Sequence, residues 1–130
     1  MFYASLFFSM LLLHFVADYT LQGWLANGKS KGWWEYQCEK RKIDIAKYKY
    51  DYICALICHA MYWTLITFIP FMFYARWTNV YSFVGFILAH TAIHVVVDDL
   101  KANRNKINLI TDQLLHLAQI GVSVALLSII

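Results

Sequence analysis

Residues 90–98 read HTAIHVVVD, so that His90, His94 and Asp98 follow one another at steps of four inside an apolar run. A step of four stacks side chains on one face of a helix. Two further stripes share this spacing, and they are His14 with Asp18 and Asp112 with His116. Ionisable groups inside apolar helices are costly and indicate a functional site by default. The pattern therefore predicts apolar helices that carry a buried polar site.

The composition is typical of a membrane protein. Of the 130 residues, 61% are hydrophobic and 18% aromatic, only one is proline, and the mean hydropathy is +0.51. Soluble domains are rarely this apolar, and the chain is too short for two globular domains. We therefore expect one integral membrane domain over residues 1–130. The net charge of +3 is modest, and we expect no nucleic-acid partner. The oligomeric state stays open.

Four apolar stretches are predicted to cross the membrane as helices, and they cover about 2–22, 52–75, 80–98 and 107–130. Each approaches the roughly 20 residues that a span requires. The first lacks the basic start and the small-residue cleavage site of a signal peptide, and it carries His14 and Asp18. We expect it to be retained, which gives an all-α bundle of four transmembrane helices.

Basic residues predict the orientation of this bundle. Hairpin connections place the segments 23–51 and 99–106 on one side of the membrane, and these hold ten of the eleven Lys and Arg. The remaining one, Arg76, lies in the short connection 76–79. The positive-inside rule makes the basic side cytoplasmic and puts both termini outside the inner membrane.

The basic connection 23–51 has ambiguous local structure. Trp33, Trp34 and Tyr36 are typical of interfacial anchors. Residues 43–50 alternate between apolar and polar side chains, as a strand does. A small hairpin, an amphipathic segment on the membrane surface and a solvated basic loop all remain open.

The polar residues of the four spans are predicted to meet at one depth. With a helix rise of about 1.5 Å per residue, all the histidines fall in the cytoplasmic half of the membrane. The polar rows are His14–Asp18–Gln22, His90–His94–Asp98 and Asn108–Asp112–His116–Gln119, with His59 in the second span. Polar faces turn inward because lipid cannot satisfy them. The sequence thus predicts a polar His/Asp pocket open toward the cytoplasm.

Imidazole and carboxylate together suit zinc, iron or manganese. We expect one or two divalent transition-metal ions, zinc in preference, and the candidate ligands are His14, His59, His90, His94, His116, Asp18, Asp98 and Asp112. The three aspartates are also candidate catalytic bases or partners that fix a histidine tautomer. A metal with an open position would activate water. The leading hypothesis is a membrane-embedded metal-dependent hydrolase.

Haem is a competing hypothesis for the histidines. It would need facing histidines and space for its ring, yet only Gly85 and Gly121 fall within the later spans. A non-enzymatic metal- or haem-binding module and a purely structural polar network also remain open. Transport is disfavoured, because the outer half of each span lacks ionisable groups.

Basic residues beside the pocket predict an anionic substrate, such as a membrane lipid headgroup or a small phosphorylated molecule. The candidate substrate-binding residues are Gln22, Lys29, Lys101, Arg104 and Gln113. The lysines and the arginine are equally explained by the ordinary positive-inside bias.

The motifs resemble those of a family of small prokaryotic and phage membrane proteins catalogued as domain of unknown function 3307. The motifs that carry the resemblance are His14-x-x-x-Asp18-x-x-Leu21-Gln22, His90-x-x-x-His94-x-x-x-Asp98 with Lys101, and Asp112-Gln113-x-x-His116. They span three of the four predicted helices, and His59 fits the remaining one. A looser similarity links them to bacterial membrane proteins labelled metal-dependent hydrolases. The resemblance implies the fold and the site, and it supplies no known reaction.

Overall fold

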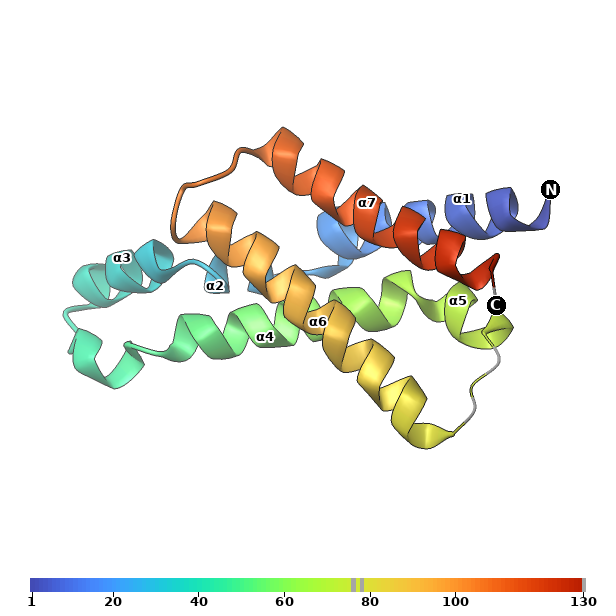
Figure 1. Ribbon diagram of the computed structural model, residues 1–130. Coiled ribbons are helices and arrows are strands. Elements are labelled where there is room, and N and C mark those ends of the chain that lie inside the picture. The colour runs from blue at the N-terminus through green and yellow to red at the C-terminus, as the bar shows by residue number, and fades with distance from the viewer. Residues whose placement is uncertain (76, 78, 130) are drawn as a thin grey trace.

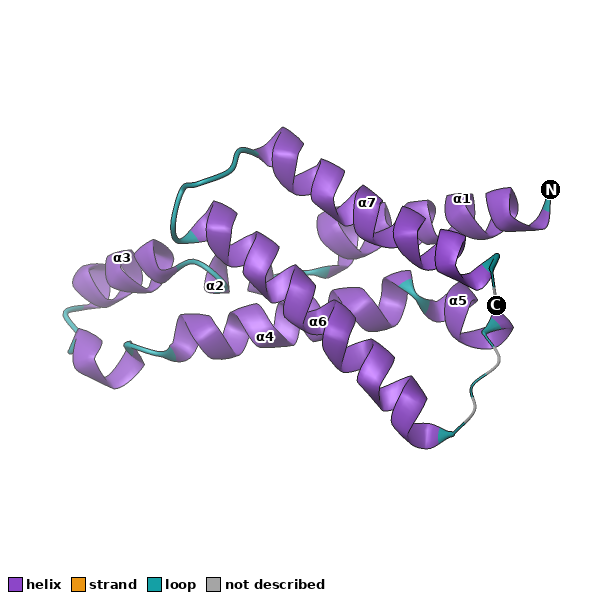
Figure 2. Ribbon diagram, viewed as in Figure 1, coloured by secondary structure: helices purple, strands orange, loops and turns teal. Residues whose placement is uncertain are grey.

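The computed structural model of the protein describes residues 1–75, 77 and 79–129. Arg76, the single basic residue of the predicted second connection, lies outside the described residues. All regular elements among the described residues are helices, and no strand occurs there (Figure 2). The predicted all-α class is therefore confirmed.

Within the described residues, three helices are long and apolar enough to cross a membrane. Helix α1 (Phe2–Phe15) continues as a π-helical segment (Val16–Leu21), and together they form a run of 20 residues. Helices α6 (Val80–Ala102) and α7 (Leu109–Leu127) contain 23 and 19 residues. At about 1.5 Å per residue, each approaches or exceeds the roughly 30 Å of a bilayer core.

The predicted span 52–75 is not one helix. Helix α4 (Asp51–Thr67) ends at Phe68, and a short helix α5 (Ile69–Tyr74) follows. Pro70 lies in the first turn of α5. Proline has no N–H to donate, and its ring clashes with the carbonyl four residues earlier, so a continuous helix cannot pass through this position.

The basic connection is helical, and of the three alternatives left open for it, the small hairpin is ruled out because residues 43–50 contain no strand. It holds α2 (Leu25–Gly28), α3 (Lys31–Arg41) and a 3₁₀ turn (Ile45–Tyr48). The Asp44 side chain caps this turn by accepting a hydrogen bond from the Ala46 N–H at 2.9 Å. A capping aspartate therefore starts a turn where alternation alone suggested a strand.

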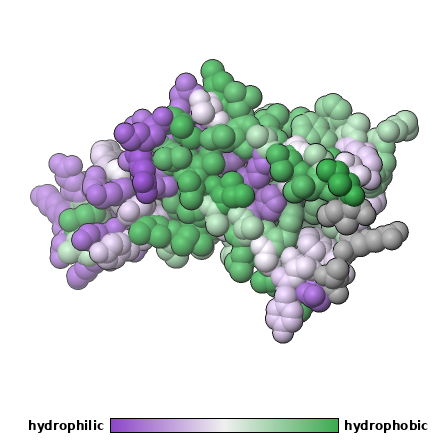
Figure 3. All heavy atoms as spheres, in the orientation of Figure 1, coloured by the Kyte–Doolittle hydropathy of each residue, from purple (hydrophilic) through white to green (hydrophobic). Residues whose placement is uncertain are grey.

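The long helices run between two ends of different character. Helix α4 packs most extensively against α6, α1 contacts both α4 and α7, and α6 contacts α7. The α6–α7 connection lies at the same end as α2 and α3, and both termini lie at the other end (Figure 1). Hydrophilic residues gather over the end that carries α2 and α3, whereas hydrophobic residues cover much of the remaining face in Figure 3.

Burial is inverted relative to a soluble protein. Large apolar side chains face outward, with Phe8, Leu88 and Leu114 more than 60% exposed. Polar side chains lie inside, and His14, His59, His94, His116 and Asp112 are fully buried. A large exposed apolar surface marks an interaction site. Together with the three long apolar helices, this arrangement indicates association with a membrane.

Candidate metal centre

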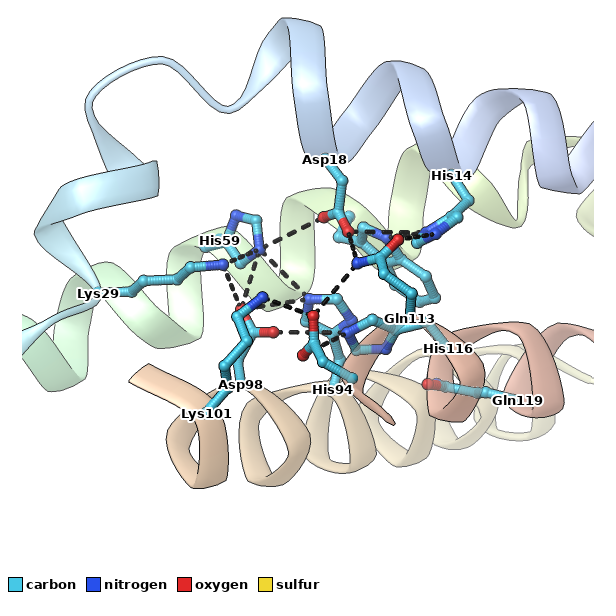
Figure 4. A network of polar contacts seen from close by, with 12 residues as sticks. His14, Asp18, Lys29, His59, His94, Asp98, Lys101, Gln113, His116 and Gln119 are labelled. Atoms are coloured by element: carbon cyan, nitrogen blue, oxygen red, sulfur yellow. Dashed lines mark hydrogen bonds and ion pairs between the residues drawn. The ribbon is translucent and has the colours of Figure 1, made fainter. Parts of the chain in front are cut away.

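The side chains of His59 on α4 and of His94 and Asp98 on α6 converge inside the bundle (Figure 4). The Nε2 atoms of His59 and His94 lie 3.3 Å apart. Asp98 Oδ2 lies 3.1 Å from His59 Nε2 and 3.6 Å from His94 Nε2. Three ligand-type atoms from two helices therefore form a nearly equilateral triangle.

This triangle matches the geometry of a metal site. Zinc binds imidazole nitrogen and carboxylate oxygen at about 2.0–2.1 Å in a tetrahedral arrangement, which separates two ligand atoms by roughly 3.3–3.4 Å. The three observed separations of 3.1, 3.3 and 3.6 Å bracket that value. The three atoms are therefore spaced like one face of a ligand tetrahedron, and a metal that binds them would displace the Lys29 ammonium group from Asp98 Oδ2 and His59 Nε2.

His116 and Asp18 extend the cluster to α7 and to the π-helical segment. His116 Nε2 lies 3.4 Å from Asp98 Oδ1, and Asp18 Oδ1 lies 3.8 Å from His59 Nε2. Two buried triads result, and they are Asp18–His59–His94 and His94–Asp98–His116, each with its ligand atoms within 4.8 Å of one another. Either triad could hold a metal ion, and His94 belongs to both.

Several buried polar atoms of the cluster make no hydrogen bond to any described residue and are of the types that bind a metal cation. Asp18 Oδ1, Asp112 Oδ1 and His116 Nε2 are buried and make no hydrogen bond within the described ranges, although His116 Nε2 lies 3.5 Å from Asp112 Oδ1 and 3.4 Å from Asp98 Oδ1. Buried polar atoms in folded proteins almost always have a partner. Two carboxylate oxygens and one imidazole nitrogen are the donor types that a divalent transition metal prefers.

Trp63 is a member of the site that the sequence analysis missed. Its ring stacks on His94 with centroids 4.2 Å apart, and its Nε1–H donates to His14 Nδ1 at 2.9 Å. His94 in turn stacks on His116 at 4.1 Å. Trp63 lies four residues after His59 on α4, and this spacing was the available signal. The three rings fix the orientation of the imidazoles by direct contact.

His14 lies beside the triads and uses both ring nitrogens. Besides Trp63, it contacts Gln113, whose Oε1 lies 3.0 Å from His14 Nε2. Gln113 Nε2 donates to Asp18 Oδ2 at 3.3 Å and to Asp112 Oδ2 at 3.2 Å. His14 therefore orients the amide that links two of the carboxylates, and neither triad includes it.

His90 is not brought into the cluster, although it lies one turn before His94 on α6. Gln119 Nε2 donates to His90 Nδ1 at 2.8 Å, and Ser123 Oγ lies 3.3 Å from His90 Nε2. The rings of Phe68 and Phe86 pack on it at 4.3 Å. His90 instead lines a cavity of about 720 Å³ together with Ser123 and mainly aromatic and apolar residues.

Two lysine side chains reach the carboxylates of the cluster. Lys29 Nζ donates to Asp98 Oδ2 at 2.6 Å and lies 3.2 Å from His59 Nε2. Lys101 Nζ donates to Asp112 Oδ2 at 2.5 Å. Lys29 is only 8% exposed, so it is an integral part of the buried site.

The short corner between α2 and α3 positions Lys29. The Asn103 side chain donates to the Lys29 carbonyl at 3.1 Å and accepts from the Lys31 N–H at 2.8 Å. Trp34 Nε1 donates to the Gly28 carbonyl at 2.7 Å. A Cβ atom at Gly28 would lie 2.6 Å from the ring of Trp24. A larger residue at this position would therefore displace the Trp24 ring next to the buried lysine.

The other predicted substrate-binding residues lie in three different environments. Gln113 lies inside the cluster, between His14 and two of the carboxylates. The Arg104 side chain is exposed and forms an ion pair with Asp99 at 2.6 Å. Gln22 Oε1 is buried and makes no hydrogen bond in the part of the chain that the structure describes. The fold thus brings Gln113 and the two lysines to the centre.

Comparison with known proteins adds no relative to this description. No family model, curated protein or solved structure matches the chain. The chemistry of the centre therefore follows from its own residues.

Proposed function

We propose that this protein is an integral membrane protein whose His/Asp cluster binds a divalent transition metal, zinc in preference, and uses it for hydrolysis. The triangle of His59, His94 and Asp98 is the observation that carries the proposal, because its edges match those of a tetrahedral site. The motif resemblance to the family catalogued as domain of unknown function 3307 agrees with this kind of fold and leaves the reaction open.

The proposed topology has four crossings, of which α4 and α5 together make the second. The positive-inside rule supports it, since ten of the eleven basic residues fall in the first and third connections. Those connections are then cytoplasmic, both termini lie outside the inner membrane, and the cluster opens toward the cytoplasmic interface.

Hydrolysis requires a nucleophile, a proton acceptor and a bound substrate. Zinc with an open coordination position supplies hydroxide at neutral pH. Asp18 and Asp112 each keep one oxygen without a hydrogen bond among the described residues, and these oxygens lie 3.8 Å from His59 Nε2 and 3.5 Å from His116 Nε2, so that either carboxylate could exchange a proton with the site. Gln113 bonds the other oxygen of each carboxylate and holds both in place.

Metal analysis of the detergent-purified protein, prepared without chelator, tests this proposal. We expect about one or two divalent ions per chain, as for other catalytic zinc sites. An absorption spectrum recorded on the same sample tests for haem. A metal content below about a tenth of an ion per chain, under conditions where structural and catalytic sites normally stay loaded, would overturn the proposal.

A metal-free polar network is the second candidate, and the two lysines favour it. Lys29 pairs with Asp98 and Lys101 with Asp112, so two of the three carboxylates already have a cation. A non-enzymatic metal-binding module is a third candidate, in which protein ligands fill every coordination position of the ion and leave none open for water. Haem has less support, because the rings of Trp63, His94 and His116 lie in mutual contact at 4.1–5.1 Å.

A further inference from the structure

The charge of the cluster is nearly balanced without a metal. Its carboxylates are Asp18, Asp98 and Asp112, and its ammonium groups are Lys29 and Lys101. Histidines that bind a metal through nitrogen are neutral. Three negative and two positive groups leave one net negative charge inside a largely apolar bundle.

A divalent metal reverses the sign of this charge. One ion changes the net charge of the cluster from one negative to one positive, and a second ion would make it three positive. The metal would also compete directly with Lys29, since both bind Asp98 Oδ2 and approach His59 Nε2. An uncompensated charge in a low-dielectric interior is strongly unfavourable. The centre loaded with one ion would therefore favour an anion on the metal, which is hydroxide in the resting state and an anionic group when substrate binds.

We propose that the metal-loaded centre binds a phosphate group, which the metal and the ammonium groups of Lys29 and Lys101 hold together. This inference rests on the proposed metal site and names its substrate class, which is a phosphorylated molecule. A phosphate group offers three acceptor oxygens, one for the metal and one for each of the two lysines, whereas a carboxylate offers only two. Lysine is a common phosphate ligand as a compact point charge.

The two lysines approach the cluster from different elements. Lys29 comes from the α2–α3 corner and Lys101 from the last turn of α6, and both reach the carboxylates in Figure 4. The Lys101 side chain is 27% exposed, whereas that of Lys29 is 10% exposed. Lys101 therefore marks the rim of the site, at the polar end of the molecule, and Lys29 marks its interior.

Calorimetric titration of inorganic phosphate into the detergent-purified protein tests the inference. The zinc-loaded protein should bind phosphate, and the metal-free protein should bind it at least about tenfold more weakly. Lys29→Met and Lys101→Met should each weaken phosphate binding by roughly 10–100-fold, as expected for the loss of one charged hydrogen bond. Lys31→Met is the matched control, because Lys31 lies at the same corner, is exposed, and pairs only loosely with Glu35 at 3.6 Å. It should change the affinity by less than about twofold.

Lys29→Arg keeps a cation at the interior position, and it should retain most of the phosphate binding that Lys29→Met loses. Zinc content is measured on every sample. Lys29→Met should keep its zinc or bind it more tightly, because the variant removes a cation that competes for Asp98. A zinc-loaded protein that ignores phosphate, or binds it equally well without either lysine, would refute the inference and leave the metal site standing. A chain that retains no zinc would refute both.

Lipid nanodiscs distinguish the two sources of phosphate. Phosphatidic acid presents a terminal phosphate in the membrane, and phosphatidylcholine presents none that is free. Weaker apparent binding of inorganic phosphate in phosphatidic-acid nanodiscs than in phosphatidylcholine nanodiscs would support a lipid headgroup as occupant. Equal binding in both would support a soluble phosphorylated molecule.

Discussion

Replacing His94 with alanine should abolish the thermal stabilisation that the protein gains from added zinc. His94 is the one residue shared by both triads, so the variant removes a nitrogen ligand from each of them. Its ring also packs on Trp63 at 4.2 Å and on His116 at 4.1 Å. The substitution therefore lowers stability through lost packing as well, by roughly 2–4 kcal/mol. The informative quantity is the zinc-dependent change in melting temperature within each variant.

The size of that change follows from mass action. Zinc at 100 times its Kd stabilises the wild-type protein by about 2.7 kcal/mol, which corresponds to roughly 10 °C for a chain of this length. Loss of a residue that only hydrogen-bonds to a metal ligand already weakens metal binding by about 10–100-fold. Loss of the ligand itself should therefore weaken zinc binding by at least about 100-fold. The same zinc concentration then stabilises His94→Ala by only about 0.4 kcal/mol, or roughly 1–2 °C.

The assay is thermal unfolding in detergent, with and without zinc, of the wild-type protein and two variants. His90→Ala is the matched control, because His90 lies one turn away on α6 and bonds to Gln119 and Ser123 rather than to the cluster. It should keep the full zinc response. A full zinc response in His94→Ala, or its loss in His90→Ala, would refute the assignment of the site.

Contacts around the centre and the proposed topology lead to three more predictions. Trp63→Phe keeps a ring against His94 but removes the N–H that donates to His14; it should cost about 1 kcal/mol of stability and leave the zinc response intact in the same melting assay. Gly28→Ala should weaken phosphate binding in the calorimetric assay, because its Cβ would lie 2.6 Å from Trp24 next to Lys29, whereas Gly32→Ala should not, because its nearest neighbour lies at 3.8 Å. For topology, Lys42→Cys in a chain without the native cysteines should react with an impermeant maleimide only after the membrane is opened, and labelling of intact cells would contradict a cytoplasmic 23–51 connection. Cys38 itself is buried and is unsuitable for this purpose.

Helical spacing made much of the candidate site predictable. Steps of four place Asp18 near His14, Asp98 near His94 and Asp112 near His116, and burial of these faces brings them together because lipid cannot satisfy them. The same rule also assigned His90 to the site, whereas the structure places His90 outside the cluster. Spacing along a helix gives the face of a side chain, whereas the reach of the neighbouring helices decides where the site ends. Phe68 and Phe86 cover that next turn.

The features that the sequence did not reveal depend on contacts between distant segments. The sequence singled out Lys29 as a candidate substrate-binding residue, but it did not reveal the ion pair with Asp98, which joins residues 69 positions apart and depends on the corner around Lys29. The break in the second apolar stretch was within reach, since Pro70 lies inside it. Hydropathy averages over such a residue, because one proline scarcely changes the mean of a long apolar window.

The sequence separation of the ion pairs has a consequence for biosynthesis. A chain emerges from the ribosome N-terminus first, so Lys29 already exists when Asp98 appears, and Lys101 precedes Asp112 by 11 residues. Asp98 and Asp112 are thus each synthesised after the lysine that pairs with them. For Asp18 the order is reversed, because Gln113, which donates a hydrogen bond to it, is synthesised 95 residues later. The polar contacts of the first helix are therefore complete only once α7 has been synthesised, and the same holds for α6, whose Asp98 pairs with His116 of α7.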